Sequence, residues 1–257
     1  MRSITAAKRK RRRHIRLWAV LVWLCVWQIA SLCIGKEFLL VAPWRVVVRL
    51  WELGGTGDFW ISIAWSLLRI GGGFLLGAAA GIFLAALSAR LRRVEELLAP
   101  AMLAIKTIPV ASFIILALIW FSSRNLSVLI SFLMVLPVIY TNVLGGIRAA
   151  DPQLLEMARV FRIPPLRRFR YIYTAQVLPF FRSGCTIALG LCWKSGIAAE
   201  VIGMPDGSIG EKLQQAKIYL ATPDLFAWTA VIVCVSLAFE KGFLVLLGRL
   251  IQRVERM

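Results

Sequence analysis

The sequence is poor in the side chains that perform acid–base and metal chemistry. It has a single histidine, His14, and 13 Asp and Glu residues against 31 Lys and Arg in 257 residues. A catalytic or metal centre needs several such groups at suitable spacing. The sequence also lacks the pattern Gly-x-x-x-x-Gly-Lys-Ser/Thr, which would form a phosphate-binding loop. We therefore predict no catalytic residue, no metal site and no cofactor-binding site in this chain.

Extramembrane cysteine pairs and low-complexity linkers are also missing. The five cysteines all fall in apolar stretches, where we expect small buried hydrophobic side chains rather than disulfides or zinc ligands. They are Cys25, Cys33, Cys185, Cys192 and Cys234. Without a Gly/Ser-rich linker, one domain over 17–250 is predicted, between a basic tail at 1–16 and a short tail at 251–257.

Long hydrophobic runs are abundant. Hydrophobic residues make up 60% of the chain and the mean hydropathy is +0.77, well above a soluble domain. A run of about 20 apolar residues spans a bilayer as a helix. The sequence predicts an all-α, polytopic membrane protein with six transmembrane helices. The expected spans are 15–35, 62–89, 99–121, 125–147, 175–199 and 226–247.

The basic residues are distributed unevenly between the loops. With the N-terminus inside, the inside segments hold about 20 Lys and Arg and the outside segments about 6. This bias predicts a multi-pass protein of the cell membrane with both termini in the cytoplasm. The net charge of +18 is spread in short clusters between apolar runs, which argues against nucleic acid as a partner.

One cytoplasmic segment, 151–170, reads as a folded helical element. Asp151 is a good N-cap and Pro152 suits the first helical position. We expect a helix from Pro152 to Arg162 whose apolar stripe enters a partner protein or the chain's own membrane helices. Five arginines between Arg159 and Arg170 could instead hold the loop against anionic membrane lipid, or serve only as a topology signal.

This segment resembles the EAA loop of type I importer permeases of the ATP-binding-cassette (ABC) class, in the nitrate/sulfonate/taurine group. The family pattern is Glu-Ala-Ala, then Gly four residues after the second Ala, then Ile-x-Leu-Pro; this chain has Glu156-Met157-Ala158 and Ile172. It departs from the pattern with Arg162 in place of Gly and Thr174-Ala175 in place of Leu-Pro. We expect Pro164-Pro165 to make the helix-ending turn instead. Further similar stretches are Trp65–Arg69, Lys106–Pro109, Trp120-Phe121, Gly190–Trp193, Ala199–Gly203 and Gly207–Gly210.

The resemblance implies a non-catalytic permease fold that works with three partners. They are a dimer of a cytoplasmic ABC ATPase that binds the ATP, a second permease copy, giving a homodimer, and an extracytoplasmic solute-binding protein. The expected ATPase-coupling residues are Leu154, Leu155, Glu156, Met157, Ala158, Arg159, Phe161 and Arg162. Relatives of this kind carry nitrate, sulfonates, taurine, bicarbonate or vitamin-precursor pyrimidines, so a small anionic or vitamin-precursor-like solute is expected.

Two further features lie inside the expected spans. Gly73, Gly77 and Gly81 form consecutive Gly-x-x-x-Gly steps, which suit close helix packing within the chain or, as an alternative, between copies. Lys194 is a charge far from both ends of its span, so it is a candidate residue of the translocation pathway or one half of a structural ion pair.

Two other classes of function remain as alternatives. A secondary transporter would want inverted repeats and acidic groups or broken helices near the membrane centre, and the sequence shows neither. An intramembrane enzyme is the weaker alternative, because its acidic and nucleophilic groups would have to come from almost uncharged spans.

Overall fold

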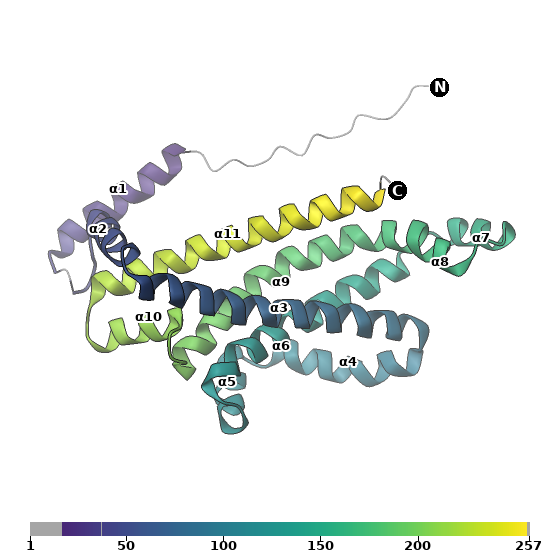
Figure 1. Cartoon of the computed structure of the whole chain (residues 1–257), viewed down its shortest axis with the longest axis horizontal. Helices are drawn as coiled ribbons and strands as arrows, with labels where there is room; N and C mark the ends of the chain where they lie inside the picture. Colours follow the sequence, from purple (N-terminus) through teal and green to yellow (C-terminus); the bar gives the residue numbers. More distant parts are fainter. Residues whose placement is uncertain (1–16, 37, 256–257) are drawn as a thin grey trace.

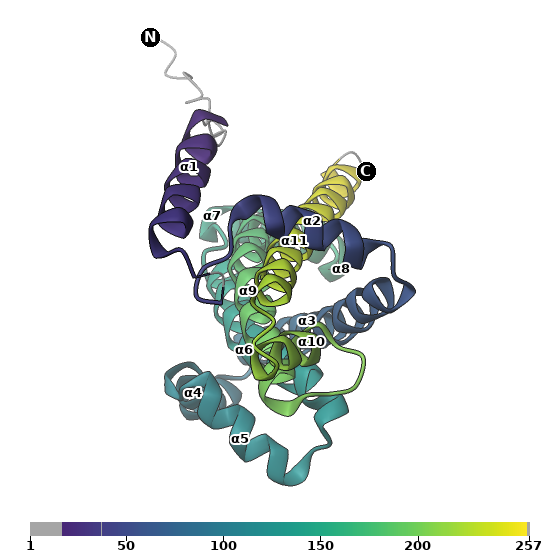
Figure 2. The ribbon, with the colours of Figure 1, turned by 90° about the vertical axis from the view of Figure 1, so that its left-hand side faces the viewer.

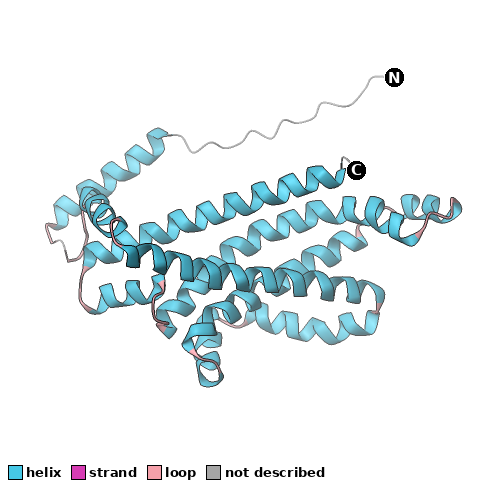
Figure 3. Ribbon diagram, viewed as in Figure 1, coloured by secondary structure: helices cyan, strands magenta, loops and turns pink. Residues whose placement is uncertain are grey.

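The structure is a computed structural model that describes residues 17–36 and 38–255. The described part is helical throughout, with no strand (Figure 3). The first six helices are α1 (Leu17–Ile34), α2 (Pro43–Gly54), α3 (Gly57–Arg90), α4 (Arg92–Thr107), α5 (Val110–Trp120) and α6 (Ser123–Arg148). The remaining helices are α7 (Pro152–Val160), α8 (Pro165–Arg168), the π-helix η1 (Phe169–Tyr173), α9 (Thr174–Gly203), α10 (Ile209–Ile218) and α11 (Thr222–Glu255).

Four long helices form the body of the molecule. In Figure 1, α3, α6, α9 and α11 run side by side along its long axis. Helices α2 and α10 lie at one end, which we call the outer end, and α7 and α8 lie at the other, the loop end. Seen along the bundle in Figure 2, α1 stands apart on one side, and α4 and α5 lie on another.

The glycine steps of α3 serve packing inside the chain. A Cβ added at Gly73 would lie 2.5 Å from the carbonyl oxygen of Val128, and one at Gly77 would lie 2.9 Å from that of Phe132, both on α6. Backbone approach this close requires glycine. The expectation of intramolecular packing is therefore confirmed, and α3 and α6 form the centre of the fold.

Four of the six expected spans fall on helices or continuous helical runs that are long and apolar enough to cross a membrane: Gly57–Arg90, Ser123–Arg148, Pro165–Gly203 and Thr222–Arg249. The third expected span, 99–121, is not one helix: α4 and α5 meet there at a bend of 107° and together form a broken span or a re-entrant loop. Ile108 and Pro109 interrupt the helix, since a proline excludes helical geometry from the residue before it. Helix α1 is a shorter apolar helix.

The ends of the chain and the cysteines complete the comparison. Helix α11 continues to Glu255, so most of the tail expected at 251–257 is helical, and the tail at 1–16 lies outside the described residues. Cys185 and Cys192 are buried as expected. Cys25, Cys33 and Cys234 are exposed on the chain, so burial was wrongly predicted for these three, which lie on helix faces that the chain itself does not cover.

Candidate functional site

Helix α7 starts as the sequence predicts. The Asp151 side chain accepts a hydrogen bond from the backbone N–H of Gln153 at 2.9 Å, and Pro152 occupies the first helical position. The backbone N–H of Asp151 donates to the Gln176 side chain of α9 at 2.7 Å. The cap satisfies one of the free N–H groups of the helix, and the second bond fixes its start against a membrane helix.

The apolar stripe of α7 has a buried edge and an exposed edge. Ala158 is only 1% exposed and Leu155 is half-buried, so this edge packs on the chain itself. Residues three, four and seven positions apart share one face of a helix. Leu154, Met157 and Phe161 therefore share a face that borders Ala158, and they are exposed, Phe161 to 74%. The stripe expected from the sequence is anchored along one edge and leaves an exposed apolar face along the other.

Arg162 makes the turn that ends α7. Its φ is 49°, in the left-handed region that favours glycine. The N–H of Ile163 donates to the carbonyl of Ala158 at 2.9 Å, and the N–H of Arg162 donates to that of Arg159 at 3.1 Å. This pair of bonds is the Schellman ending of a helix, in which the left-handed residue is usually glycine. Arg162 thus takes the place of the glycine, and the turn expected at Pro164-Pro165 is wrong, as is a helix continuing through Arg162.

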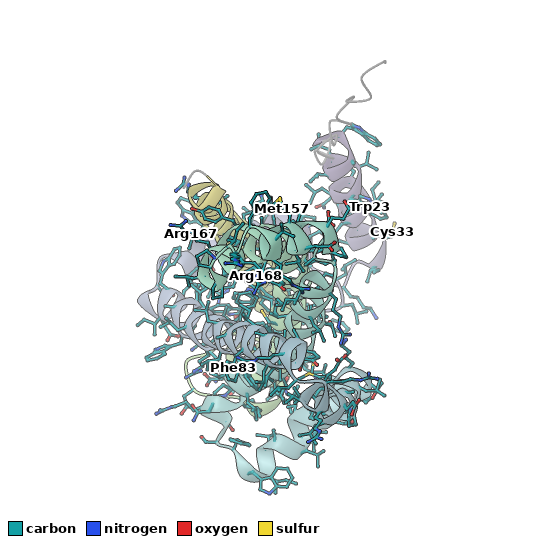
Figure 4. All side chains as sticks on the ribbon, turned by 90° about the vertical axis from the view of Figure 1, so that its right-hand side faces the viewer. Trp23, Cys33, Phe83, Met157, Arg167 and Arg168 are labelled. Carbon is teal, nitrogen blue, oxygen red and sulfur yellow. The ribbon has the colours of Figure 1, made fainter. Side chains whose placement is uncertain are left out.

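The charged residues of α7 face outward. Glu156 and Arg159 are both exposed, and the described residues show no ion pair between them. Figure 4 looks onto the loop end, where Met157, Arg167 and Arg168 are labelled. The outer side of α7 thus offers apolar and charged groups to whatever covers this end of the molecule.

Lys194 lies on a face of α9 that the chain leaves open. It is exposed, about 13 Å along the helix before its end at Gly203. Ile187 and Leu191 precede it on the same side and are also exposed. No other described residue forms an ion pair with it, so the alternative of a structural ion pair finds no partner within the described part of the chain.

Comparison with known proteins agrees with this arrangement. The model of the family described as "Binding-protein-dependent transport system inner membrane component" matches residues 77–256, most of the chain. The chain belongs to this family. A putative aliphatic sulfonates transport permease of Escherichia coli is 32% identical over 200 residues, covering 77% of this chain and 75% of that protein. A nitrate import permease of Synechococcus elongatus is 27% identical, covering 74% and 71%.

A solved structure confirms the fold. The crystal structure of an amino acid ABC transporter with histidines matches with a TM-score of 0.59 at 18% identity, covering 80% of this chain and 96% of that one. The protein is thus a type I ABC importer permease of the nitrate/sulfonate/taurine kind, a multi-pass membrane subunit. Family membership implies an ATPase and a substrate-binding protein as partners.

The permease also holds a buried polar cluster that the sequence did not reveal. Glu200 of α9 is 0% exposed; its Oε2 accepts bonds from the Ser66 hydroxyl at 2.7 Å and from the Gly210 N–H at 3.3 Å. Ser66 in turn accepts the N–H of Ile209 at 2.9 Å. Arg69 lies on α3 within electrostatic range of Glu200. The cluster joins α3, α9 and α10, and only a carboxylate in the apolar sequence of α9 hinted at it.

Lys106 lies beside the break in the third expected span. Helix α4 starts at Arg92, so Lys106 lies about 21 Å along it, next to the 107° bend. Broken helices commonly line substrate sites in transporters, and the exposed Lys106 ammonium lies at such a break.

Proposed function

We propose that two copies of this permease form the translocation pathway of an importer for a small anionic solute. A separate cytoplasmic ATPase dimer binds and hydrolyses the ATP, and this chain carries no catalytic or cofactor site. A solute-binding protein delivers the solute to the outer end. The expected pathway lies between the two copies.

The uneven distribution of basic residues supports an inward-facing loop end. Arginines gather at the ends of α3 and α6 at this end and continue through α8, whereas the outer end has fewer Lys and Arg, and two of these form ion pairs between helices. There Arg49 of α2 binds Asp224 of α11 and Glu52, and these carboxylates raise the pKa of Arg49 above its usual value. Lys212 of α10 binds Asp58 of α3 at 2.6 Å. Both termini are then cytoplasmic, and the outer end presents a surface braced by ion pairs to the binding protein.

The exposed apolar face of α7 is the observation that carries the ATPase contact. Leu154, Met157 and Phe161 are exposed on a helix whose start is capped and which the buried Ala158 anchors at the edge of the same face. An exposed apolar helix face on a rigid base is suited to a groove of a partner protein. Glu156, Arg159 and Arg162 border this face and are available for charged contacts with the ATPase.

Lys194 supports an anionic solute. A charge within a membrane span faces the bundle interior or a water-filled path rather than lipid. In the single chain Lys194 is exposed, so a second copy or the pathway has to cover it. A two-fold axis would bring two Lys194 side chains to one pathway, and two ammonium groups there favour an anion. The permeases for aliphatic sulfonates and nitrate are among the similar proteins.

The ATPase contact is tested with Phe161→Ser in the reconstituted complex. Truncating a central apolar contact residue costs about 2 kcal/mol, or roughly thirtyfold in Kd. We expect the ATPase to co-purify poorly and solute-stimulated ATP hydrolysis to fall. The matched control is Leu97→Ser, because Leu97 is 75% exposed at the loop end but lies on α4. Equal loss in both variants, or none in Phe161→Ser, would contradict the proposal.

A further inference from the structure

Two cavities adjoin at the loop end and share one residue, Arg168. The larger has a volume of about 720 Å³ and lies between α3, α6 and the start of α9. The smaller, of about 280 Å³, lies under the turn between α7 and α8. Arg168 lines both, so it stands at the boundary between them.

The larger cavity is apolar and lies at the loop end of the long helices. Ile82 and Ala86 come from the last turns of α3, Val143 from the end of α6, and Val177 and Phe181 from the first turns of α9. Its volume is in the range of pockets that hold small ligands. Among the described side chains, the arginines that line it are Arg90 and Arg168, which add positive charge to an otherwise apolar cavity.

The smaller cavity is cationic. Arg162, Arg167 and Arg168 line it, and its lining includes no carboxylate. Among the described residues, none of these three, nor Arg90, forms a side-chain ion pair. Other arginines of the chain do: Arg148 binds Glu95, for example. Four guanidinium groups therefore line the two cavities, one of them shared, and no described residue forms an ion pair with them.

A π-helix contributes residues to both cavities. η1 spans Phe169–Tyr173, directly after Arg168, and Tyr173 lines the larger cavity while Tyr171 lines the smaller one. Such widened turns are rare and concentrate at functional sites.

We propose that this double cavity binds one anionic phospholipid. The acyl chain occupies the larger cavity, and the phosphate lies at Arg168 between Arg90 and the Arg162/Arg167 pair. A soluble anion would use the cationic cavity but leave the apolar one unexplained, and a neutral lipid would leave the four arginines uncompensated. An anionic phospholipid accounts for both features, because its acyl chain suits the apolar cavity and its phosphate suits the arginines. Anionic lipids are attracted to basic clusters at the membrane surface. The bound lipid would brace the base of α7 and α8.

The test measures lipid binding to the purified full-length chain in neutral detergent by native mass spectrometry. Dioleoylphosphatidylglycerol is the probe and dioleoylphosphatidylcholine the neutral comparison. We expect one phosphatidylglycerol to be retained in preference to phosphatidylcholine. The double variant Arg90→Gln/Arg168→Gln should weaken its binding by about 25-fold, since each basic residue contributes about fivefold.

Two further variants distinguish binding in this double cavity from non-specific electrostatic attraction between the basic loop end and anionic lipid. Arg92→Gln/Arg93→Gln removes the same charge at the same end outside both cavities and should leave binding unchanged. Ala86→Trp fills the larger cavity from an exposed position on α3 and should also displace the lipid.

Three results would overturn the proposal. They are equal loss in the Arg92/Arg93 control, equal retention of phosphatidylcholine, and displacement by inorganic phosphate with no effect of Ala86→Trp. The last would show a soluble-anion site instead of a lipid site. The readout involves neither ATP hydrolysis nor transport, so its failure would leave the proposed function standing.

Discussion

Replacing Arg162 with glycine should stabilise the loop, although it deletes a charged side chain. The left-handed conformation costs a residue other than glycine roughly 1–2 kcal/mol. Replacement by glycine removes this cost, but about 0.5–1 kcal/mol of the benefit is lost because glycine has greater conformational freedom in the unfolded chain. With the Schellman hydrogen bonds of Ile163 and Arg162 kept, the net stabilisation of the turn is roughly 0.5–1 kcal/mol.

Amide hydrogen exchange followed by mass spectrometry measures this difference locally. Peptides that contain the Ile163 amide should exchange about two- to fivefold more slowly in Arg162→Gly than in the natural protein. Peptides from α6 should not change.

Arg159→Gly is the matched control. It removes the same side chain three residues earlier, inside α7, where glycine costs nearly 1 kcal/mol and exchange should become faster. If Arg162→Gly also speeds exchange, the guanidinium holds the turn by contacts stronger than the backbone strain, and the assignment of Arg162 as a strained substitute for glycine is refuted.

Three other predictions follow from the structure. Ala158→Asp places a carboxylate in a buried position, so α7 should leave its base and stimulated ATP hydrolysis should be lost while the permease stays in the membrane; normal stimulation would refute a coupling role. Lys194→Met should reduce transport and keep assembly with the ATPase, whereas collapse of assembly would indicate a structural role. In a cysteine-free background, Tyr219→Cys should react with an impermeant thiol reagent from outside only, because Tyr219 is 79% exposed at the outer end; labelling from the cytoplasm would reverse the topology. Ser208 is unsuitable for this purpose, since it is buried as the N-cap of α10.

Local rules predicted the parts of the fold that depend on neighbouring residues. The N-cap at Asp151 and the close packing at Gly73 and Gly77 both follow from residue types within a few positions of the sequence. Hydropathy gave the long spans because apolar length decides whether a helix can cross a bilayer. The break at Pro109 was readable from the proline, but the apolar run on both sides of it concealed the bend.

The exposure of individual residues in α7 was harder to predict, because its buried and exposed apolar residues look alike in sequence. Ala158 and Phe161 belong to one apolar stripe, and only the direction in which α7 leaves α6 decides which of them the chain covers. The Glu200 cluster depends on contacts between residues 66, 200 and 210, which no local pattern connects. At Arg162 a local pattern misled the prediction. The pair Pro164-Pro165 suggested a turn there, yet the hydrogen bonds that end the helix are already formed by the N–H groups of Arg162 and Ile163.

Arg162 also connects the two proposals made for the loop end. A residue that is held in an unfavourable conformation persists where its side chain is needed. Glycine would make the same turn at lower free energy, so the stability of α7 gives no reason for an arginine there. The side chain lines the cationic cavity next to Arg168, and a phosphate in that cavity would offset the backbone strain. Arg162→Gly should therefore separate the two properties: slower hydrogen exchange in the turn, together with weaker retention of phosphatidylglycerol. If Arg162→Gly is more stable and retains phosphatidylglycerol as well as the natural protein, the guanidinium contributes neither to the turn nor to lipid binding. Its remaining role would be in contacts at the exposed face of α7.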